Sequence, residues 1–379
     1  MRLLICYAHF GPYHMARARA LLKRHDVEPV FLELSQSQKS HPWLGEKDER
    51  DIPVFSLCTG ALEQIDQREA TFRMREFLNR VTPDVVAMAG YGLPVLQAAA
   101  WWARQRRKGS MLLFETCRHD KRRNPLLEGL KRWMIPRLYN AGFVGGLRHR
   151  AYLIELGIPS DRIRESSAVV DNDFFSAGAQ KTRAQEEIWR KRLGLPSRYF
   201  LFTGRLASEK NVFGLLRAYR AYRDRGGDRS LVLLGDGPLR AEFERYVKEQ
   251  RIPEVIHRGF VPTSELPPYY ALSDCFVLPS TIEPWGLVVN EAMASGLPVI
   301  VSDICGCAPE LVQAGNGFLF SPGESERLAA LLAKIGAMTD EQRRGLGKES
   351  ERIIRHFSLD QWAEGLVSAA QAAREARGA

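Results

Sequence analysis

The chain carries at residues 278–291 the segment Leu-Pro-Ser-Thr-Ile-Glu-Pro-Trp-Gly-Leu-Val-Val-Asn-Glu, which leads from an apolar run into a helix-like stretch. Pro284 disfavours helical geometry at the preceding residue, so we expect the carboxylate of Glu283 to lie in an extended turn. A helix that begins near Gly286 has N–H groups in its first turn without partners inside the helix, and these groups suit a phosphate. The segment therefore predicts a strand, a phosphate-binding turn and a helix.

A second acid, Glu291, follows the first about one and a half turns into this helix. Gly296 and Pro298 are typical of the end of a helix, so the helix is short. Carboxylates bind hydroxyl groups well, because their oxygens accept charge-assisted hydrogen bonds. Two acids beside a phosphate site indicate a pocket for a sugar that is joined to a nucleotide.

An earlier strand-like run, residues 199–203, ends in Gly204 and Arg205, and Lys210 follows shortly afterwards. Ligands of open parallel sheets bind beyond the carboxyl ends of the strands, which is where these two cations are expected. They would neutralise a diphosphate and stabilise the charge that grows on a departing group. Alone they would be ordinary surface charges, but together with the two acids they favour a diphosphate site.

Apolar runs alternate with amphipathic stretches along the 379 residues, which is typical of α/β folds with parallel, doubly wound sheets. Two series of strands are predicted, first at residues 3–7, 30–34, 85–89, 111–114 and 142–145, and then at residues 199–203, 231–234, 255–258, 275–278 and 299–302. We expect a linker near residues 172–182 and a terminal helix over residues 357–374.

Three motifs resemble the retaining GT-B glycosyltransferases of family 4, or glycosyl transferases group 1: Glu-x7-Glu from Glu283 to Glu291, the turn at residues 204–210, and Gly235-Asp236-Gly237-Pro238. The resemblance covers residues 199–325. It implies a GT-B fold, in which two Rossmann-like doubly wound domains face each other across a cleft. The implied parts are an acceptor-side domain at residues 1–175, a nucleotide-sugar-binding domain at residues 183–355, and a C-terminal helix at residues 356–379 that packs back toward the first domain.

The resemblance implies that Arg205 and Lys210 hold the donor diphosphate. It also implies that Glu283 contacts the donor sugar and that Glu291 binds the ribose, while main chain around Gly259, Phe260 and Val261 holds the base. The motif at residues 235–238 is expected to be a structural turn. The complete set of expected donor-binding residues is Gly11, Gly204, Phe260, Val261, Gly286, Leu287, Val288 and Glu291, and the expected catalytic residues are Glu283, Arg205, Lys210 and His119.

The first half offers weaker motifs. Gly11 follows the first strand and would let backbone approach a phosphate. The dinucleotide fingerprint G-x-G-x-x-G is absent after the opening strands, which argues against a nicotinamide enzyme. After the strand at residues 111–114, Glu115 and His119 are alternative candidates to line the cleft, and an ordinary loop histidine is an equal interpretation of His119.

Neither a metal nor another cofactor is expected. Asp171-Asn172-Asp173 has the acid spacing of a metal-binding triplet, but its place near the linker favours capping or a turn. Cys305 and Cys307 lack two further ligands at a suitable spacing, so we interpret them as small loop residues. Six cysteines without a regular framework indicate free thiols in a reducing compartment, and we expect a cytoplasmic protein.

The net charge of +9 is concentrated in residues 101–150, which hold 13 Lys and Arg against 3 Asp and Glu. This stretch is either a solvated basic face or a peripheral contact with anionic lipid at the inner membrane face, a phosphorylated acceptor or nucleic acid. The apolar runs are far shorter than the roughly 20 residues of a membrane helix, and the N-terminus lacks the features of a signal peptide.

The sequence therefore predicts an enzyme, a retaining hexosyltransferase that moves a sugar from a UDP- or GDP-sugar to a lipid-linked, glycan or small-molecule acceptor. A role in polysaccharide or glycolipid biosynthesis follows from this expectation, and nucleic acid is not an expected partner. One alternative is a nucleotide-sugar epimerase or hydrolase of the same fold. The other is a nucleic-acid-binding protein that uses the basic residues 101–150.

Overall fold

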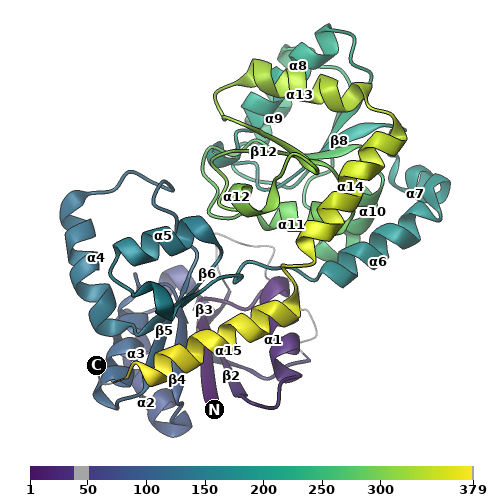
Figure 1. Cartoon of the computed structure of the whole chain (residues 1–379). Coiled ribbons are helices and arrows are strands. Elements are labelled where there is room, and N and C mark those ends of the chain that lie inside the picture. Colours follow the sequence, from purple (N-terminus) through teal and green to yellow (C-terminus); the bar gives the residue numbers. More distant parts are fainter. Residues whose placement is uncertain (38–50, 378–379) are drawn as a thin grey trace. The chain divides into compact units, whose positions relative to one another are not determined.

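The computed structural model describes residues 1–37 and 51–377, which form two compact units (Figure 1). Unit 1 comprises Met1–Val170 together with Leu359–Ala379, and unit 2 comprises Asp171–Ser358. Each unit contains one parallel β-sheet with helices packed on it. The last helix of the chain thus returns to the unit in which the chain begins.

Unit 1 has a seven-stranded sheet in the order β3-β2-β1-β4-β5-β6-β7, and all neighbouring strands are parallel. Its strands are β1 (Arg2–Tyr7), β2 (Glu28–Ser37), β3 (Val54–Ala61), β4 (Val85–Ala89), β5 (Gly109–Phe114), β6 (Ala141–Val144) and β7 (Ile163–Arg164). The direction of the strand order reverses between β1 and β4. The central strands are apolar and buried because helices cover both faces of a parallel sheet.

The helices of unit 1 are α1 (Pro12–Leu22), α2 (Gln67–Val81), α3 (Pro94–Gln105), α4 (Pro125–Leu138), α5 (Leu147–Glu155) and α15 (Leu359–Glu375), with 3₁₀ turns at Leu62–Gln64 and Ser160–Arg162. Polar side chains define where two of them begin. Asp66 accepts hydrogen bonds from the first amides of α2, and Asn124 does the same for α4.

Helix α15 packs against β5 and β6 and against α1 (Figure 1). Trp362 is 1% exposed and lies edge-on to the ring of Phe143. At Gly109 the helix comes so close that an added Cβ would lie 3.1 Å from the backbone of Ala373. The apolar face of α15 is therefore part of the core of unit 1, and the predicted terminal helix is confirmed.

Unit 2 has a six-stranded parallel sheet in the order β10-β9-β8-β11-β12-β13. Its strands are β8 (Tyr199–Thr203), β9 (Ser230–Leu234), β10 (Val255–His257), β11 (Cys275–Leu278), β12 (Val299–Ser302) and β13 (Gly317–Phe320). Its helices are α6 (Asn172–Arg183), α7 (Glu186–Leu193), α8 (Val212–Asp224), α9 (Arg240–Glu249), α10 (Pro267–Ala271), α11 (Leu287–Ala294), α12 (Ala308–Leu311), α13 (Ser325–Ala337) and α14 (Asp340–Ile354), with 3₁₀ turns at Ser208–Lys210 and Thr263–Glu265.

The predicted linker at residues 172–182 is wrong, because this segment is helix α6 of unit 2. Asp171 caps the helix through the amide of Phe174, which confirms the interpretation of the acidic triplet as capping. Phe175 is buried and lies edge-on to the ring of Tyr270. The polar residues that suggested a linker form the solvated face of an amphipathic helix.

Among the described residues, no helix combines the length and the apolar character that are needed to cross a bilayer.

Replacing Trp362 by Ala should destabilise unit 1, because the substitution leaves a cavity between α15 and the sheet. We expect the free energy of unfolding to fall by about 3–5 kcal/mol, measured by urea titration. Trp101→Ala is the matched control, since the Trp101 side chain is 46% exposed and its loss should change the stability little. Equal losses in the two variants would contradict the packing described for α15.

Candidate active site

The candidate site lies where the strand order of the unit 2 sheet reverses, between β8 and β11. These strands are parallel neighbours, so the loops that follow them emerge side by side at the carboxyl edge. Open α/β sheets bind ligands at such a reversal point, because the two loops diverge there and leave room between them. Arg205 and Lys210 follow β8, while Glu283 and Glu291 follow β11. The topology therefore places all four charged residues predicted for unit 2 on the two segments that follow these strands at one edge of the sheet.

The loop after β8 presents two cations, of which one is paired with an acid and the other is not. Lys210 ends the 3₁₀ turn Ser208–Lys210, and its ammonium group forms an ion pair with Oε2 of Glu283. The half-buried Arg205 has no side-chain hydrogen bond or ion pair within the described part of the chain. One cation thus orients an acid of the site, and the other remains available to a ligand.

The carboxylate of Glu283 is held from two sides. It is 7% exposed, and the hydroxyl of Ser280 donates to its Oε2 at 3.2 Å, beside the ion pair with Lys210. Backbone contacts hold the two loops in register, because the Thr281 amide donates to the carbonyl of Glu209 at 2.8 Å. A charged pair so little exposed is stable only when such bonds compensate the loss of water.

Gly286 turns the chain into helix α11. Its φ of +102° is a left-handed conformation, and an added Cβ would lie 3.0 Å from a methyl group of Leu278. The preceding turn is fixed from the loop after β12, since the amide of Gly306 donates to the carbonyl of Glu283 at 2.9 Å. Leu287 and Val288 then form the first turn of α11, where N–H groups have no carbonyl partner within the helix.

Glu291 lies deeper than the other acid. Its side chain is fully buried, and its Oε2 accepts a hydrogen bond of 2.6 Å from the hydroxyl of Tyr270. Tyr270 comes from α10, in the connection that precedes β11. The position of the Glu291 carboxylate is therefore set by a buried tyrosine that the sequence motifs did not reveal.

The turns after β8, β9 and β10 are joined through glycines. The amide of Gly235 donates to the carbonyl of Gly259, and a Cβ at Gly235 would lie 2.0 Å from the carbonyl oxygen of Gly204. No side chain fits there, which agrees with a structural role for the motif at residues 235–238. Beyond Gly259 the Phe260 side chain is 43% exposed and Val261 is half-buried.

In unit 1, Gly11 precedes helix α1 in an extended conformation with φ −97°, which any residue can adopt. Its amide donates to Nδ1 of His14 at 3.1 Å. Burial lowers the pKa of His14 to about 3, with a further contribution from the charge of Arg17, so this imidazole is neutral and can accept the bond. The conformational freedom expected of Gly11 is not used in this structure.

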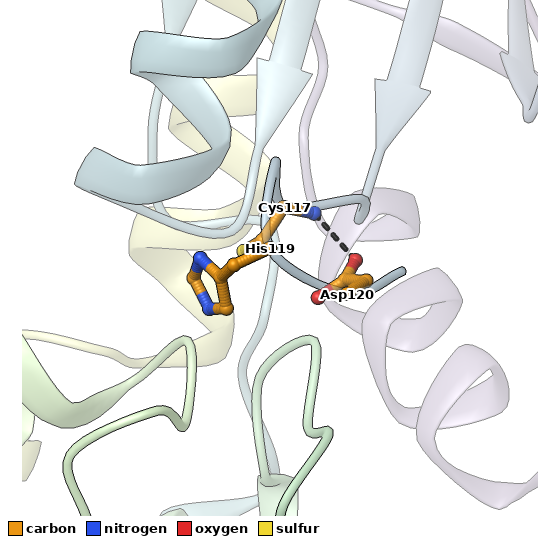
Figure 2. A group of neighbouring side chains, drawn as sticks. All are labelled: Cys117, His119 and Asp120. Atoms are coloured by element: carbon orange, nitrogen blue, oxygen red, sulfur yellow. Dashed lines mark hydrogen bonds between the residues drawn. The ribbon is translucent and has the colours of Figure 1, made fainter. Parts of the chain in front are cut away.

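The loop after β5 holds Cys117, His119 and Asp120, whose potential ligand atoms all lie within 4.8 Å of one another (Figure 2). The Asp120 carboxylate accepts a hydrogen bond of 2.6 Å from the Cys117 amide, and the Cys117 sulfur lies 3.3 Å from Nε2 of the buried His149. The first bond closes the turn from within, and the second connects the turn to helix α5. Three neighbouring side chains of this kind are also a possible ligand set for a metal ion, which the sequence analysis did not consider.

Glu115 and His119 are both exposed in this loop, so burial does not decide between them. The cysteines give a clearer result, because all six are free thiols, as the sequence predicted, and the structure shows that all six are buried. Burial raises the pKa values of Cys275 and Cys307 well above the ordinary value for a thiol.

Two side chains of the unit 2 site escaped prediction. Ser280 lies within the quoted segment, three residues before Glu283, and its spacing alone does not distinguish a hydrogen-bond donor from a small loop residue. Tyr270 follows Pro267, Pro268 and Tyr269, a pattern that reads as a short buried helix. Its bond to Glu291 depends on the packing of α10 against α6 and of the Tyr270 ring against Phe276 of β11, which no local motif encodes.

Comparisons with known proteins show which family and which folds this chain is similar to. Residues 185–352 match the family described as glycosyl transferases group 1, a region that includes every candidate residue of unit 2. The chain is 29% identical over 222 residues to the 2-deoxystreptamine glucosyltransferase of Streptomyces kanamyceticus, which covers 57% of this chain and 56% of that protein. It is 33% identical over 210 residues to the D-inositol 3-phosphate glycosyltransferase of Corynebacterium glutamicum, which covers 52% of this chain and 49% of the relative. The chain spans about half the length of the curated relatives it matches.

Solved structures resemble the whole chain. A glycosyltransferase from Rickettsia africae has a TM-score of 0.79 at 14% identity, with 98% of each chain covered. The Anabaena protein HepE, solved with UDP and glucose, has a TM-score of 0.74 at 17% identity, with 97% of this chain and 98% of that chain covered. With its two parallel Rossmann-like sheets, this chain has the GT-B fold, and its residues 185–352 match glycosyl transferases group 1.

Proposed function

We propose that this protein is a retaining glycosyltransferase that moves a hexose from a UDP- or GDP-sugar to an acceptor hydroxyl. The observation that carries the proposal is the meeting of Arg205, Lys210, Glu283 and the start of α11 at the reversal point of one sheet. This arrangement combines positive charge and N–H donors for a diphosphate with a carboxylate for a sugar.

The diphosphate is proposed to bind between Arg205 and the first turn of α11. Arg205 has no competing side-chain partner in the described chain, and a guanidinium group can donate two parallel bonds to phosphate oxygens. The N–H groups of Leu287 and Val288 carry the positive end of the helix dipole. Charges already in place before the bond breaks stabilise the leaving diphosphate without reorganisation.

The sugar is proposed to bind at Glu283. Lys210 and Ser280 both contact Oε2 of this acid, so no described bond occupies Oε1, which can accept a sugar hydroxyl. The ammonium group of Lys210 has three N–H donors and pairs with one carboxylate here. It can therefore contact a phosphate oxygen while it keeps Glu283 in position.

Retention of the anomeric configuration is proposed on the basis of the family resemblance. In that scheme the acceptor oxygen attacks the anomeric carbon from the face that the diphosphate leaves, and a diphosphate oxygen takes the acceptor proton. No separate general base is needed, and no metal or other cofactor is proposed. Gly11 and either His119 or Glu115 are the proposed contributions of unit 1.

The names of the relatives support a choice of donors and acceptors. HepE was solved with UDP and with UDP-glucose, and one relative from Mycolicibacterium smegmatis is named a GDP-mannose-dependent phosphatidylinositol monomannoside mannosyltransferase. Other relatives are named for 2-deoxystreptamine and D-inositol 3-phosphate. We propose a UDP- or GDP-sugar donor, a lipid-linked, glycan or small-molecule acceptor, and a cytoplasmic role in polysaccharide or glycolipid biosynthesis.

Arg205→Ala, Lys210→Ala and Glu283→Ala should each lower the transfer rate by about 10²-fold or more, because each removes a preorganised charge from the transition state. The measurement is steady-state transfer with the donor and acceptor identified by screening. Arg245→Ala, at an exposed cation of α9 in the same unit, is the control and should keep its activity. Transfer at the wild-type rate in all three site variants would overturn the assignment.

A uridine or guanosine diphosphate should raise the melting temperature of the wild-type protein, since ligands that bind only the folded state stabilise it. Comparing UDP with GDP identifies the base, and Arg205→Ala should reduce the shift. If the melting temperature shifts with neither UDP nor GDP, the proposal is contradicted. Rapid turnover of the donor without acceptor would instead indicate an epimerase or hydrolase.

Glu291 is proposed to bind the ribose, and its role can be tested with deoxynucleotides. The wild-type protein should bind UDP or GDP more tightly than the matching 2′-deoxy or 3′-deoxy nucleotide, whereas Glu291→Gln should discriminate less. Tyr270→Phe removes one bond that positions this carboxylate, so it should also weaken discrimination, at a stability cost of about 1 kcal/mol for the lost hydrogen bond. Unchanged discrimination in Glu291→Gln would remove the ribose role.

A further inference from the structure

Helix α4 exposes large apolar side chains on its outer face. Leu126 is 84% exposed, Leu127 55%, Leu130 56% and Trp133 58%. Leu126, Leu130 and Trp133 follow one another at helical spacing, so they form a continuous stripe rather than scattered contacts. Four such side chains on a helix of 14 residues call for an explanation, because contiguous exposed apolar surface marks an interaction site.

The opposite face of α4 fixes this orientation. Ile135 is fully buried in the core of unit 1, and Glu128 is 6% exposed. The Glu128 carboxylate accepts a hydrogen bond of 2.7 Å from the hydroxyl of Tyr152 and pairs with Lys131 at 2.7 Å. Rotating the helix to bury the leucines would pull Ile135 out of the core and break the bond to Tyr152, so the stripe stays outward.

The segment that carries the apolar stripe is also rich in cations. Residues 121–137 contain six Lys and Arg against the single acid Glu128, which is already paired. Arg137 lies over the ring of Trp133 at 4.7 Å. Three of these cations have no partner within the described parts of the chain, namely Lys121, Arg122 and Arg132.

The combination of exposed aromatic side chains and cations continues onto α3. The Arg104 guanidinium donates to the carbonyl of Arg137 at 2.8 Å, which joins the ends of the two helices. Trp101, 46% exposed, lies one turn before Arg104 on the same side of α3. Indole rings beside cations are typical of surfaces at the boundary between lipid and water.

We propose that α4 and the cations before it, residues 121–137, form a docking surface for an anionic phospholipid bilayer. The leucines and Trp133 enter the boundary between headgroups and acyl chains, while Lys121, Arg122 and Arg132 contact phosphate groups. Charge complementarity selects this partner, because a second copy of the chain would bring the same positive charge against itself. Nucleic acid could bind the cations, but it offers no apolar environment in which the exposed leucines could be buried.

Vesicle sedimentation tests this docking surface with the full chain. The protein should bind vesicles of phosphatidylcholine and phosphatidylglycerol at low salt, and bind pure phosphatidylcholine vesicles much more weakly. Neutralising the three unpartnered cations with Lys121→Gln, Arg122→Gln and Arg132→Gln should weaken binding on the order of 10²-fold, since each cation near an anionic surface contributes about 1 kcal/mol. The double variant Leu130→Glu, Trp133→Glu should lose at least about tenfold.

Ile188→Glu is the matched control, because Ile188 is 64% exposed on α7 of unit 2 and its substitution should leave vesicle binding unchanged. All variants should keep the wild-type circular dichroism spectrum and the nucleotide-dependent shift in melting temperature, which separates this proposal from that of the transferase. Three results would overturn it: equal binding by the variants and the control, binding to duplex DNA without binding to anionic vesicles, or a dimer that Leu130→Glu, Trp133→Glu abolishes in the absence of vesicle binding.

Discussion

The ion pair between Lys210 and Glu283 connects the two loops on which the candidate site is built. Both partners are largely withdrawn from water, so their mutual contact and the bond from Ser280 to Glu283 compensate the lost hydration. The pair exists because β8 and β11, distant in sequence, are neighbours in the sheet. The same pairing of β8 with β11 also determines the positions of Arg205 and of the first turn of α11. The chemistry proposed for this unit therefore rests on strand order as much as on residue type.

Backbone packing keeps these loops from spreading. The contact between Gly235 and the carbonyl of Gly204 leaves no space for a side chain, and the left-handed turn at Gly286 sets the direction of α11. The hydroxyl of Tyr270 donates a hydrogen bond to the buried carboxylate of Glu291 in α11. Rigid loops of this kind suit a site whose task is to hold charges in fixed positions before a bond breaks.

Sequence patterns predicted the elements whose signal is local. Buried central strands such as β8 are continuous apolar runs, and the two-acid motif identified the turn into α11 because Pro284 and Gly286 have strong conformational preferences. Predictions failed where tertiary packing decides. Strand β7 has only two residues, and β3 is largely exposed, so neither has a distinct pattern. Helix α6 looked like a linker because its polar face dominates its composition, and the partner of Glu291 lies 21 positions away.

The return of α15 to unit 1 has a consequence for how the protein is made. Unit 2 is inserted between two parts of unit 1, and Trp362 belongs to the core of the unit that is synthesised first. Strands β1 to β7 therefore leave the ribosome long before α15, the helix that packs on β5 and β6, is synthesised. Unit 2 can fold while the nascent sheet of unit 1 still exposes apolar surface. The growing chain is accordingly most in need of chaperones during the synthesis of its second half.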